Sequence, residues 1–208
     1  VSNRIYSTYI RKREFLSWLN SNGIDMVFFN EQNWWPPIVW CKEKGIRTGA
    51  YIDYYTMKTM PYFSLYDFLI CNTQRHYSAF DWHPNVYYVP WGTDVDIFSP
   101  KVKDFKGKVI FFHSSGLAEN RKGTDLLLRA FVMLPSNSAE LIIHSQRNLQ
   151  NYVCSTLGRT KNDLESLGVK FIEKSVTAPG LYHLGHVYVY PTRLEGIGLT
   201  ILEALSCG

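Results

Sequence analysis

Short apolar runs alternate along this chain with stretches of helical periodicity, and this alternation limits the folds that the chain can adopt. Runs rich in β-branched and aromatic residues occupy 24–29, 46–52, 68–71, 86–89, 109–112, 141–144, 169–172 and 187–190. Strands that alternate with helices form parallel sheets covered by those helices. The sequence therefore predicts the α/β class.

The composition fits a folded protein with a core. The 208 residues are 46% hydrophobic and 19% charged, which excludes a disordered or coiled-coil chain. The net charge is +4 without a long basic run, so no nucleic-acid partner is expected. No apolar stretch reaches the roughly 20 residues of a membrane-spanning helix and no signal peptide opens the chain. We expect a cytoplasmic protein, and whether the full-length protein contacts a membrane surface stays open.

The four cysteines carry no recognisable metal or disulfide pattern. Cys41, Cys71, Cys154 and Cys207 lie far apart, with no C-x-x-C pair and no histidine cluster at zinc spacing. The sequence therefore predicts buried thiols in a reducing compartment and no metal site.

A change of composition indicates two domains. Pro, Lys, Asp and Gly gather between residues 99 and 108, as in an exposed linker. We place the boundary near Asp104, with domains at 1–103 and 104–208. Two such domains of usual size need roughly 300 residues or more. We therefore expect an internal piece of a longer protein, with both sheets incomplete and no activity in the piece alone.

The most informative segment reads PTRLEGIGLTILEALSCG and follows the apolar run at 187–190. It predicts a strand, a glycine-bearing turn and a helix. Gly196 and Gly198 allow the backbone to approach a ligand closely, and the amides of Leu199 and Thr200 open a helix whose dipole favours a phosphate. The turn is therefore a candidate anion cradle.

Two glutamates accompany this turn. Glu195 lies in it and Glu203 lies about one helical turn into the helix. We expect both carboxylates to face one crevice at the carboxyl edge of the sheet, where they would bind sugar hydroxyls.

A second run, GLAENRKGTDLLLRAF, follows the first strand of the second domain. Arg121 and Lys122 are expected in a loop between strand and helix, where they would neutralise a pyrophosphate without a metal. Gly123 permits the turn and Thr124 is expected to cap the next helix. Taken alone, the run fits a solvated loop with two surface charges equally well. Neither run matches the dinucleotide-binding or P-loop pattern, so dehydrogenases and nucleotide triphosphatases lack their fingerprints.

These residues carry a resemblance to a known family. The segment 188–208, with its Glu-x7-Glu spacing, resembles the signature of retaining GT-B glycosyltransferases of the "glycosyl transferases group 1" family. Lys122-Gly123 resembles the lysine-glycine motif of that family, and 89–94 with 98–100 resembles its interdomain segment. The family usually has an arginine after the glycine at Gly116, where this chain has Leu117. Whether Arg121 replaces that arginine is left open.

The resemblance implies two Rossmann-like domains, of which the second binds a nucleotide diphosphate sugar. It implies transfer of the sugar to a glycan, lipid or small acceptor, with retention of configuration and without a metal or other cofactor. Glu203 would hold the ribose hydroxyls, Glu195 would contact the transferred sugar, and Lys122 with Arg121 would stabilise the diphosphate. The further donor-binding residues that it implies are Gly116, Gly196, Ile197, Gly198, Leu199 and Thr200.

Two other readings share these features. A nucleotide-sugar epimerase or a sugar-phosphate synthase would use the same architecture with no separate acceptor or with a sugar phosphate. A non-catalytic nucleotide-sugar-binding module would keep only the donor cradle.

Overall fold

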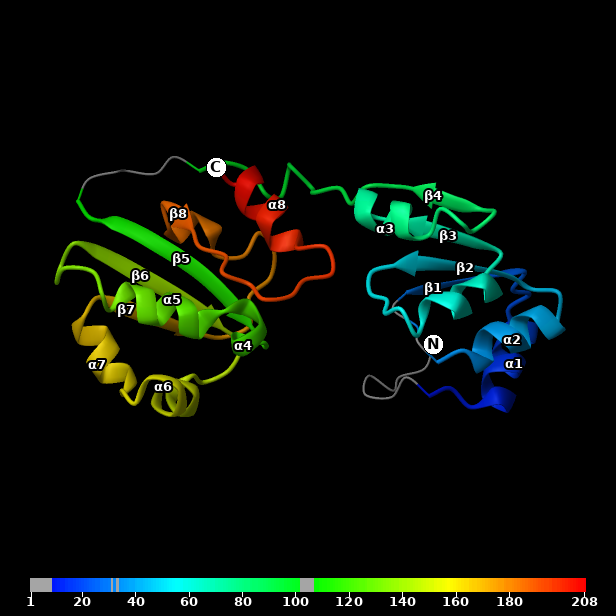
Figure 1. Ribbon diagram of the computed structural model, residues 1–208, viewed down its shortest axis with the longest axis horizontal. Coiled ribbons are helices and arrows are strands. Elements are labelled where there is room, and N and C mark those ends of the chain that lie inside the picture. Colours follow the sequence, from blue (N-terminus) through cyan, green and yellow to red (C-terminus); the bar gives the residue numbers. More distant parts are fainter. Residues whose placement is uncertain (1–8, 31, 33, 102–106) are drawn as a thin grey trace. The chain divides into compact units, whose positions relative to one another are not determined.

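The computed structural model describes residues 9–30, 32, 34–101 and 107–208 (Figure 1). The chain divides into two compact units, one ending at Gly92 and the other starting at Thr93. Among the described residues each unit contains a four-stranded sheet whose paired strands all run parallel. The predicted α/β class, with two parallel sheets flanked by helices, is confirmed.

The first unit carries its strands in the order β1-β2-β3-β4. Its elements are α1 (Lys12–Ser21), β1 (Met26–Asn30), α2 (Pro36–Glu43), β2 (Arg47–Ile52), η1 (Met60–Leu65), β3 (Phe68–Cys71), α3 (Gln74–Ala79) and β4 (Val86–Tyr88). Gly23, just after α1, has φ +59°, which is the left-handed conformation that the Asn-Gly pair predicts for a helix end.

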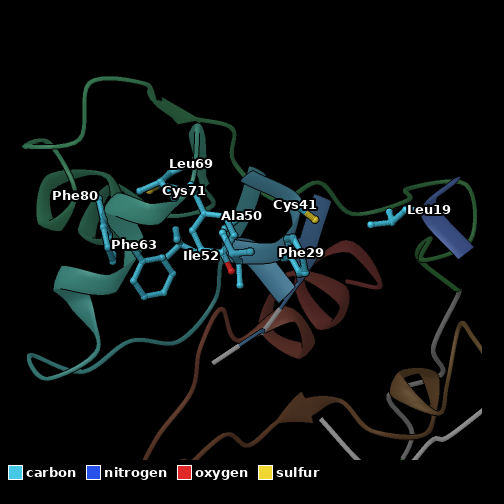
Figure 2. Close-up of a cluster of buried hydrophobic side chains, with 11 residues drawn as sticks. Leu19, Phe29, Cys41, Ala50, Ile52, Phe63, Leu69, Cys71 and Phe80 are labelled. Carbon is cyan, nitrogen blue, oxygen red and sulfur yellow. The ribbon is translucent and has the colours of Figure 1, made fainter. Parts of the chain in front are cut away.

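The core of the first unit lies between one face of this sheet and its helices (Figure 2). Ala50, Ile52 and Leu69 from the strands meet Leu19 and Phe63 from the helical segments, and all five are at most 6% exposed. Side chains alternate between the two faces along a strand, which is why only every second strand residue enters this core.

The second unit carries its strands in the order β7-β6-β5-β8. Its elements are β5 (Val109–Gly116), α4 (Glu119–Lys122), α5 (Thr124–Phe131), β6 (Ala139–Ser145), α6 (Gln150–Leu157), α7 (Lys161–Ser166), β7 (Val169–Glu173), η2 (Tyr182–Leu184), β8 (Val187–Tyr188) and α8 (Leu199–Ser206).

Both faces of the second sheet are packed. Leu141 and Ile143 of β6 lie in a core with residues of α5, α6 and α7. Phe112 and Ile142 face the other way and pack with Tyr182 and the end of α8. Figure 1 shows α8 on the opposite side of the sheet from α5. The chain leaves the carboxyl end of β5 toward α4 and continues from β8 to α8.

The division between the units differs from the predicted boundary. The predicted boundary residue, Asp104, lies outside the described residues, and the units separate earlier, after Gly92. Residues after Gly92 belong with the second unit because the ring of Phe98 packs against Tyr182 with centroids 6.3 Å apart, and its carbonyl accepts a hydrogen bond from the Ser206 hydroxyl.

Two local expectations are wrong. Thr124 does not cap α5; it is the first helical residue, Gly123 precedes it, and its hydroxyl lies 2.9 Å from Nε2 of the buried His113. Cys154 is exposed on α6, whereas the other three cysteines are buried as expected. Among the residues that the structure describes, no helix combines the length and apolar character needed to cross a bilayer.

Candidate functional site

A cluster of opposite charges lies where α4 meets the loop between β8 and α8. Lys122 Nζ lies 2.7 Å from Glu195 Oε1, and Arg121 Nη1 lies 2.9 Å from Glu195 Oε2. The Thr192 hydroxyl also donates to Oε1, at 2.8 Å. The Lys122 and Glu195 side chains are only 12% and 18% exposed. Each oxygen of this carboxylate is thus held by a different cation, of which Lys122 is largely buried and Arg121 is 42% exposed.

These contacts fix the charge state of Glu195. Burial by itself would raise the pKa of Glu195, but hydrogen bonds from Lys122 and Thr192 and the charge of Lys122 lower it to about 2. The carboxylate therefore stays ionised at neutral pH and balances one of the two nearby positive charges. Lys122, Arg121 and Glu195 together therefore carry one net positive charge, which can attract an anion.

Tyr190 completes the surroundings of Lys122. Lys122 Nζ donates to the Tyr190 hydroxyl at 3.3 Å and lies 5.0 Å from the centre of its ring. A cation over an aromatic face is attracted by the ring quadrupole. Burial is the main cause that raises the pKa of Tyr190, so its hydroxyl stays protonated at neutral pH. Tyr190 therefore holds the Lys122 ammonium group in place, and because its hydroxyl is neutral it does not neutralise the positive charge of that group.

Gly123 allows α4 to approach the β8–α8 loop. Its φ is +72°, and a Cβ built there would lie 2.0 Å from the carbonyl oxygen of Pro191. Only glycine combines this left-handed backbone with such a close approach. Arg121 and Lys122 lie in the one-turn helix α4 rather than in the predicted loop, and the turn at Gly123 is as predicted.

The glycine turn ends at the start of α8. Gly198 has φ +75° and is the N-cap residue, so the amides of Leu199 and Thr200 open the helix as predicted. The Thr200 hydroxyl is buried beside the hydroxyls of Tyr188 and Tyr190. Gly196 and Ile197 lie in the loop before it. The turn therefore brings the first amides of α8, which have no partner within the helix, close in sequence to the charged cluster.

Gly116 lies at the end of β5, on the same sheet edge. It has φ +56° and pairs with Ser145 at the end of β6. Leu117, which stands where the resembled family has an arginine, is 52% exposed. Arg121, four residues further along the chain, contacts Glu195 together with Lys122.

Glu203 belongs to a separate set of contacts. It lines a pocket of about 190 Å³ together with Ser114, His144 and residues 176–182. The Tyr182 hydroxyl donates to Glu203 Oε2 at 2.5 Å. Burial, together with the negative charge of Glu203, raises the pKa of Tyr182, so this hydroxyl remains a donor.

The polar groups in this pocket have defined roles. His144 Nε2 lies 2.8 Å from the carbonyl of Lys174, which can only accept, so His144 donates there. Its Nδ1 then accepts from the Ser114 hydroxyl, at 3.0 Å. Ser114 and Glu203 are left to accept hydrogen bonds from a ligand, which suits hydroxyl or N–H groups.

The structure brings Lys122, Arg121 and Glu195 into direct contact, whereas Glu203 contacts Tyr182. The two glutamates do share one neighbour. Burial raises the pKa of Tyr188 to about 12, and the charges of Glu203 and Glu195 both add to this rise. Both carboxylates therefore act on the same buried hydroxyl of β8.

Several residues of the site carry no local sequence signal. Tyr182 follows an irregular stretch and reaches Glu203 only through the fold of residues 176–182. Arg193 and Asp125 form a close ion pair although they are 68 positions apart. Tyr190 is the exception, because its place at the end of a predicted strand, just before the glycine turn, marks it as a neighbour of the site.

Comparisons with known proteins identify a family and relatives that this chain resembles. Residues 107–208 match the family model described as "Glycosyl transferases group 1". The chain is 27% identical over 144 residues to mannosylfructose-phosphate synthase of Agrobacterium fabrum, covering 60% of this chain and 31% of that protein. It is 35% identical over 99 residues to O-antigen chain mannosyltransferase B of Escherichia coli, covering 45% of this chain and 25% of that protein. The chain thus spans about a third or less of these curated relatives.

Solved structures share the fold across both units. Anabaena HepE in complex with UDP matches with a TM-score of 0.70 at 16% identity, covering 93% of this chain and 60% of that one. A glycosyltransferase from Rickettsia africae matches with a TM-score of 0.69 at 12% identity, covering 99% and 62%. The fold and the family match agree: residues 107–208, which form most of the second unit, match the glycosyl transferases group 1 family.

Proposed function

We propose that the full-length protein is a glycosyltransferase that moves a sugar from a nucleotide diphosphate sugar to an acceptor. The observation that carries the proposal is the pairing of the largely buried Glu195 with Lys122 and with the partly exposed Arg121. Fixed cations and helix amides are what a departing diphosphate needs, because its negative charge grows in the transition state. The relatives support it, since one is named a mannosyltransferase and one solved neighbour holds UDP.

In this proposal the phosphates lie at Lys122, Arg121 and the amides of Leu199 and Thr200. The bond between the sugar C1 and the diphosphate oxygen breaks, and the acceptor hydroxyl oxygen forms the new bond to C1 on the same face. The hydroxyl proton leaves with the diphosphate. The charges of the chain offset the leaving group, so the proposed reaction uses no metal ion and no cofactor.

The nucleoside is proposed to occupy the pocket at Glu203. The ribose hydroxyls would donate to the free acceptor positions of Glu203, whose other oxygen is held by Tyr182. Glu195, Gly196 and Ile197 would then face the transferred sugar. Gly116 would border the phosphates at the end of β5.

A cytoplasmic location of the full-length protein remains a prediction.

A sugar phosphate is the second candidate acceptor. The relative from Agrobacterium fabrum is named a mannosylfructose-phosphate synthase, and its match extends over 144 residues. A glycan, a lipid or a small molecule with a free hydroxyl would otherwise accept the sugar. Product analysis with a labelled donor, with and without sugar phosphates, separates these acceptors. Product formed without any acceptor would instead indicate an epimerase.

Calorimetry on the full-length protein with a panel of nucleoside diphosphates tests the proposal. We expect saturable binding of one of them. Glu203→Ala should weaken this binding, whereas Lys122→Ala should mainly lower kcat, by about 100-fold or more. Absence of binding across the panel would refute the proposed donor, and binding without donor hydrolysis or transfer would indicate a non-catalytic module.

A further inference from the structure

Arg193 and Asp125 form a two-pronged ion pair in the second unit. Arg193 Nη1 donates to Asp125 Oδ1 and Nη2 donates to Oδ2, both at 2.7 Å. Nη1 also donates to the backbone carbonyl of Asn120, at 2.5 Å. The Asp125 side chain is only 13% exposed. Because a forked pair fixes direction as well as distance, Arg193 is held in one orientation against the start of α5.

Neither partner changes its charge near neutral pH. The hydrogen bond from Arg193 is the main cause that lowers the pKa of Asp125, and the same bond raises the pKa of Arg193. The Tyr152 hydroxyl of α6 adds a donor to Asp125 Oδ1, at 3.5 Å. The pair therefore persists over the pH range in which an enzyme of this kind would be assayed.

Backbone hydrogen bonds continue this connection between α4 and the β8–α8 loop. The Arg193 amide donates to the Arg121 carbonyl at 2.8 Å, and the Thr192 hydroxyl donates to the same carbonyl at 3.1 Å. In return, Arg121 Nη1 donates to the Leu194 carbonyl at 3.0 Å. The two segments are thus joined at several points besides the ion pairs of Glu195.

The positions of the pair in the sequence show what it controls. Asp125 comes three residues after Lys122, and Arg193 comes two residues before Glu195. Contact between Asp125 and Arg193 therefore helps to set the separation of the backbones that carry Lys122 and Glu195, together with the bonds to Arg121. This constraint stays in place when a ligand draws Lys122 away from Glu195, because Arg193 and Asp125 make their contacts with each other.

We infer that Arg193 and Asp125 are positioning residues for the charged site, an inference that rests on the proposed function. They form a clamp, here the Arg193–Asp125 clamp, that holds Lys122 and Glu195 at the spacing needed to receive a diphosphate. Misplacement of a catalytic group by about 1 Å can cost about 100-fold in rate. Loss of the clamp is therefore expected to act on turnover more than on donor affinity.

Hydrogen–deuterium exchange on the full-length protein tests the clamp without reference to activity. In Arg193→Ala we expect amide exchange at least about tenfold faster in residues 119–125 and 191–196, because the side-chain bonds of Arg193 to Asp125 and Asn120 are lost while the other links between the segments remain. The matched control is Arg129→Ala. Arg129 also belongs to the second unit and donates to a backbone carbonyl, that of Thr156, at 2.6 Å. The control should leave exchange in both segments unchanged.

Steady-state kinetics tests the positioning role. Arg193→Ala is expected to lower kcat by about 10- to 100-fold while the KM for the donor changes less than about threefold. Arg193→Lys should recover only part of this loss, since a lysine supplies the charge but not the fork. Arg129→Ala should keep the kcat of the wild type. Should Arg193→Ala not fold, Asp125→Asn, which keeps the shape of the side chain, gives the same two readouts.

Unchanged exchange in the two segments would overturn the clamp. Faster exchange with an unchanged kcat would overturn the positioning role, because the pair would then be only structural. Faster exchange in Arg193→Ala, together with no transfer by the wild-type protein, would refute the proposed function while the clamp itself stands.

Discussion

Lys122 Nζ and Glu195 Oε1 lie 2.7 Å apart, and Arg121 holds the other oxygen of the same carboxylate at 2.9 Å. The two cations that the proposed function assigns to a diphosphate are thus already engaged by a carboxylate of the chain. Because like charges exclude each other at this distance, a phosphate group must displace Glu195 or share the cations with it. Donor binding and the Glu195 ion pairs are therefore expected to compete.

Glu195→Gln tests this competition. Removal of the carboxylate charge should strengthen the binding of inorganic pyrophosphate, by about tenfold, because Lys122 and Arg121 no longer face a neighbouring anion. Sugar transfer should fall at the same time if Glu195 contacts the sugar. Calorimetry measures the first effect and a transfer assay measures the second.

The matched control is Glu173→Gln. Glu173 pairs with Lys161 at 2.7 Å in the same unit, and its side chain is likewise 18% exposed. Its loss should lower stability without altering the binding of pyrophosphate. Equal affinity of the wild type and Glu195→Gln for pyrophosphate would contradict the competition.

The low pKa of Glu195 predicts an acid-sensitive contribution to stability. In the folded protein the pKa is about 2, below its ordinary value of 4.5. The folded state thus favours the ionised form, so its ion pairs stabilise the protein above about pH 4.5, and this stabilisation is lost as the pH falls toward about 2. The free energy of unfolding of the wild type should fall by about 1–2 kcal/mol more than that of Glu195→Gln over this range. Urea titrations at several pH values provide the measurement, and parallel curves would speak against the predicted contribution.

Gly123→Ala should be strongly destabilising. The new Cβ would meet the Pro191 carbonyl at 2.0 Å on a backbone with φ +72°. We expect a loss of about 2–5 kcal/mol in the free energy of unfolding, from left-handed strain and overpacking together. Gly158→Ala is the control, since Gly158 has φ +64° but no atom within 4 Å of the new Cβ, and should cost only about 1–2 kcal/mol. Thermal denaturation of both variants would show whether the close approach adds to the strain.

Tyr182→Phe should weaken the binding of the nucleoside and leave the binding of the phosphates unchanged. The variant loses the hydrogen bond that holds Glu203 Oε2, and a bond to a charged group contributes about 1.5–3 kcal/mol. We expect the Kd of a nucleoside diphosphate to rise about tenfold, while the affinity for inorganic pyrophosphate stays unchanged. Tyr66→Phe is the control, because the buried Tyr66 hydroxyl has no hydrogen-bond partner among the described residues. A parallel loss of pyrophosphate binding would show that Tyr182 does not act through the nucleoside.

The sequence predicts the bounds of a strand well where the apolar run and the hydrogen-bonded segment coincide. The strand at 68–71 is found as β3 at the same residues, because its apolar run coincides with its pairing to β2 and β4. The run at 187–190 is shorter in the structure, where β8 ends at Tyr188. The Val189 amide still donates to the Phe112 carbonyl of β5, and from Thr192 onward the chain bonds to the Arg121 carbonyl of α4 instead. The apolar character of a segment does not show at which residue the chain leaves one hydrogen-bond partner for another.

The site was predictable where the residues lie in local motifs. Lys122 and Glu195 stand in short runs with glycines, and the structure brings them into contact. The role of each in catalysis stays a prediction. Arg193 and Asp125 could not be paired from the sequence, since a charge on a loop and a charge on a helix have many partners available. Only the tertiary fold, through the close approach at Gly123, selects this one.

The Glu203 pocket and the Lys122–Glu195 pair are built from different segments. The pocket is lined by residues 176–182, by Phe98, by side chains of β5 and β6 and by Glu203 of α8, whereas the ion pair joins α4 to the loop that contains Glu195. If the nucleoside binds in this pocket as proposed, substitutions at 176–182 can alter which nucleobase is accepted while the Lys122–Glu195 pair keeps its geometry. Homologous enzymes with different donors are then expected to diverge at 176–182, and a chimaera that exchanges this segment should inherit the base preference of its source.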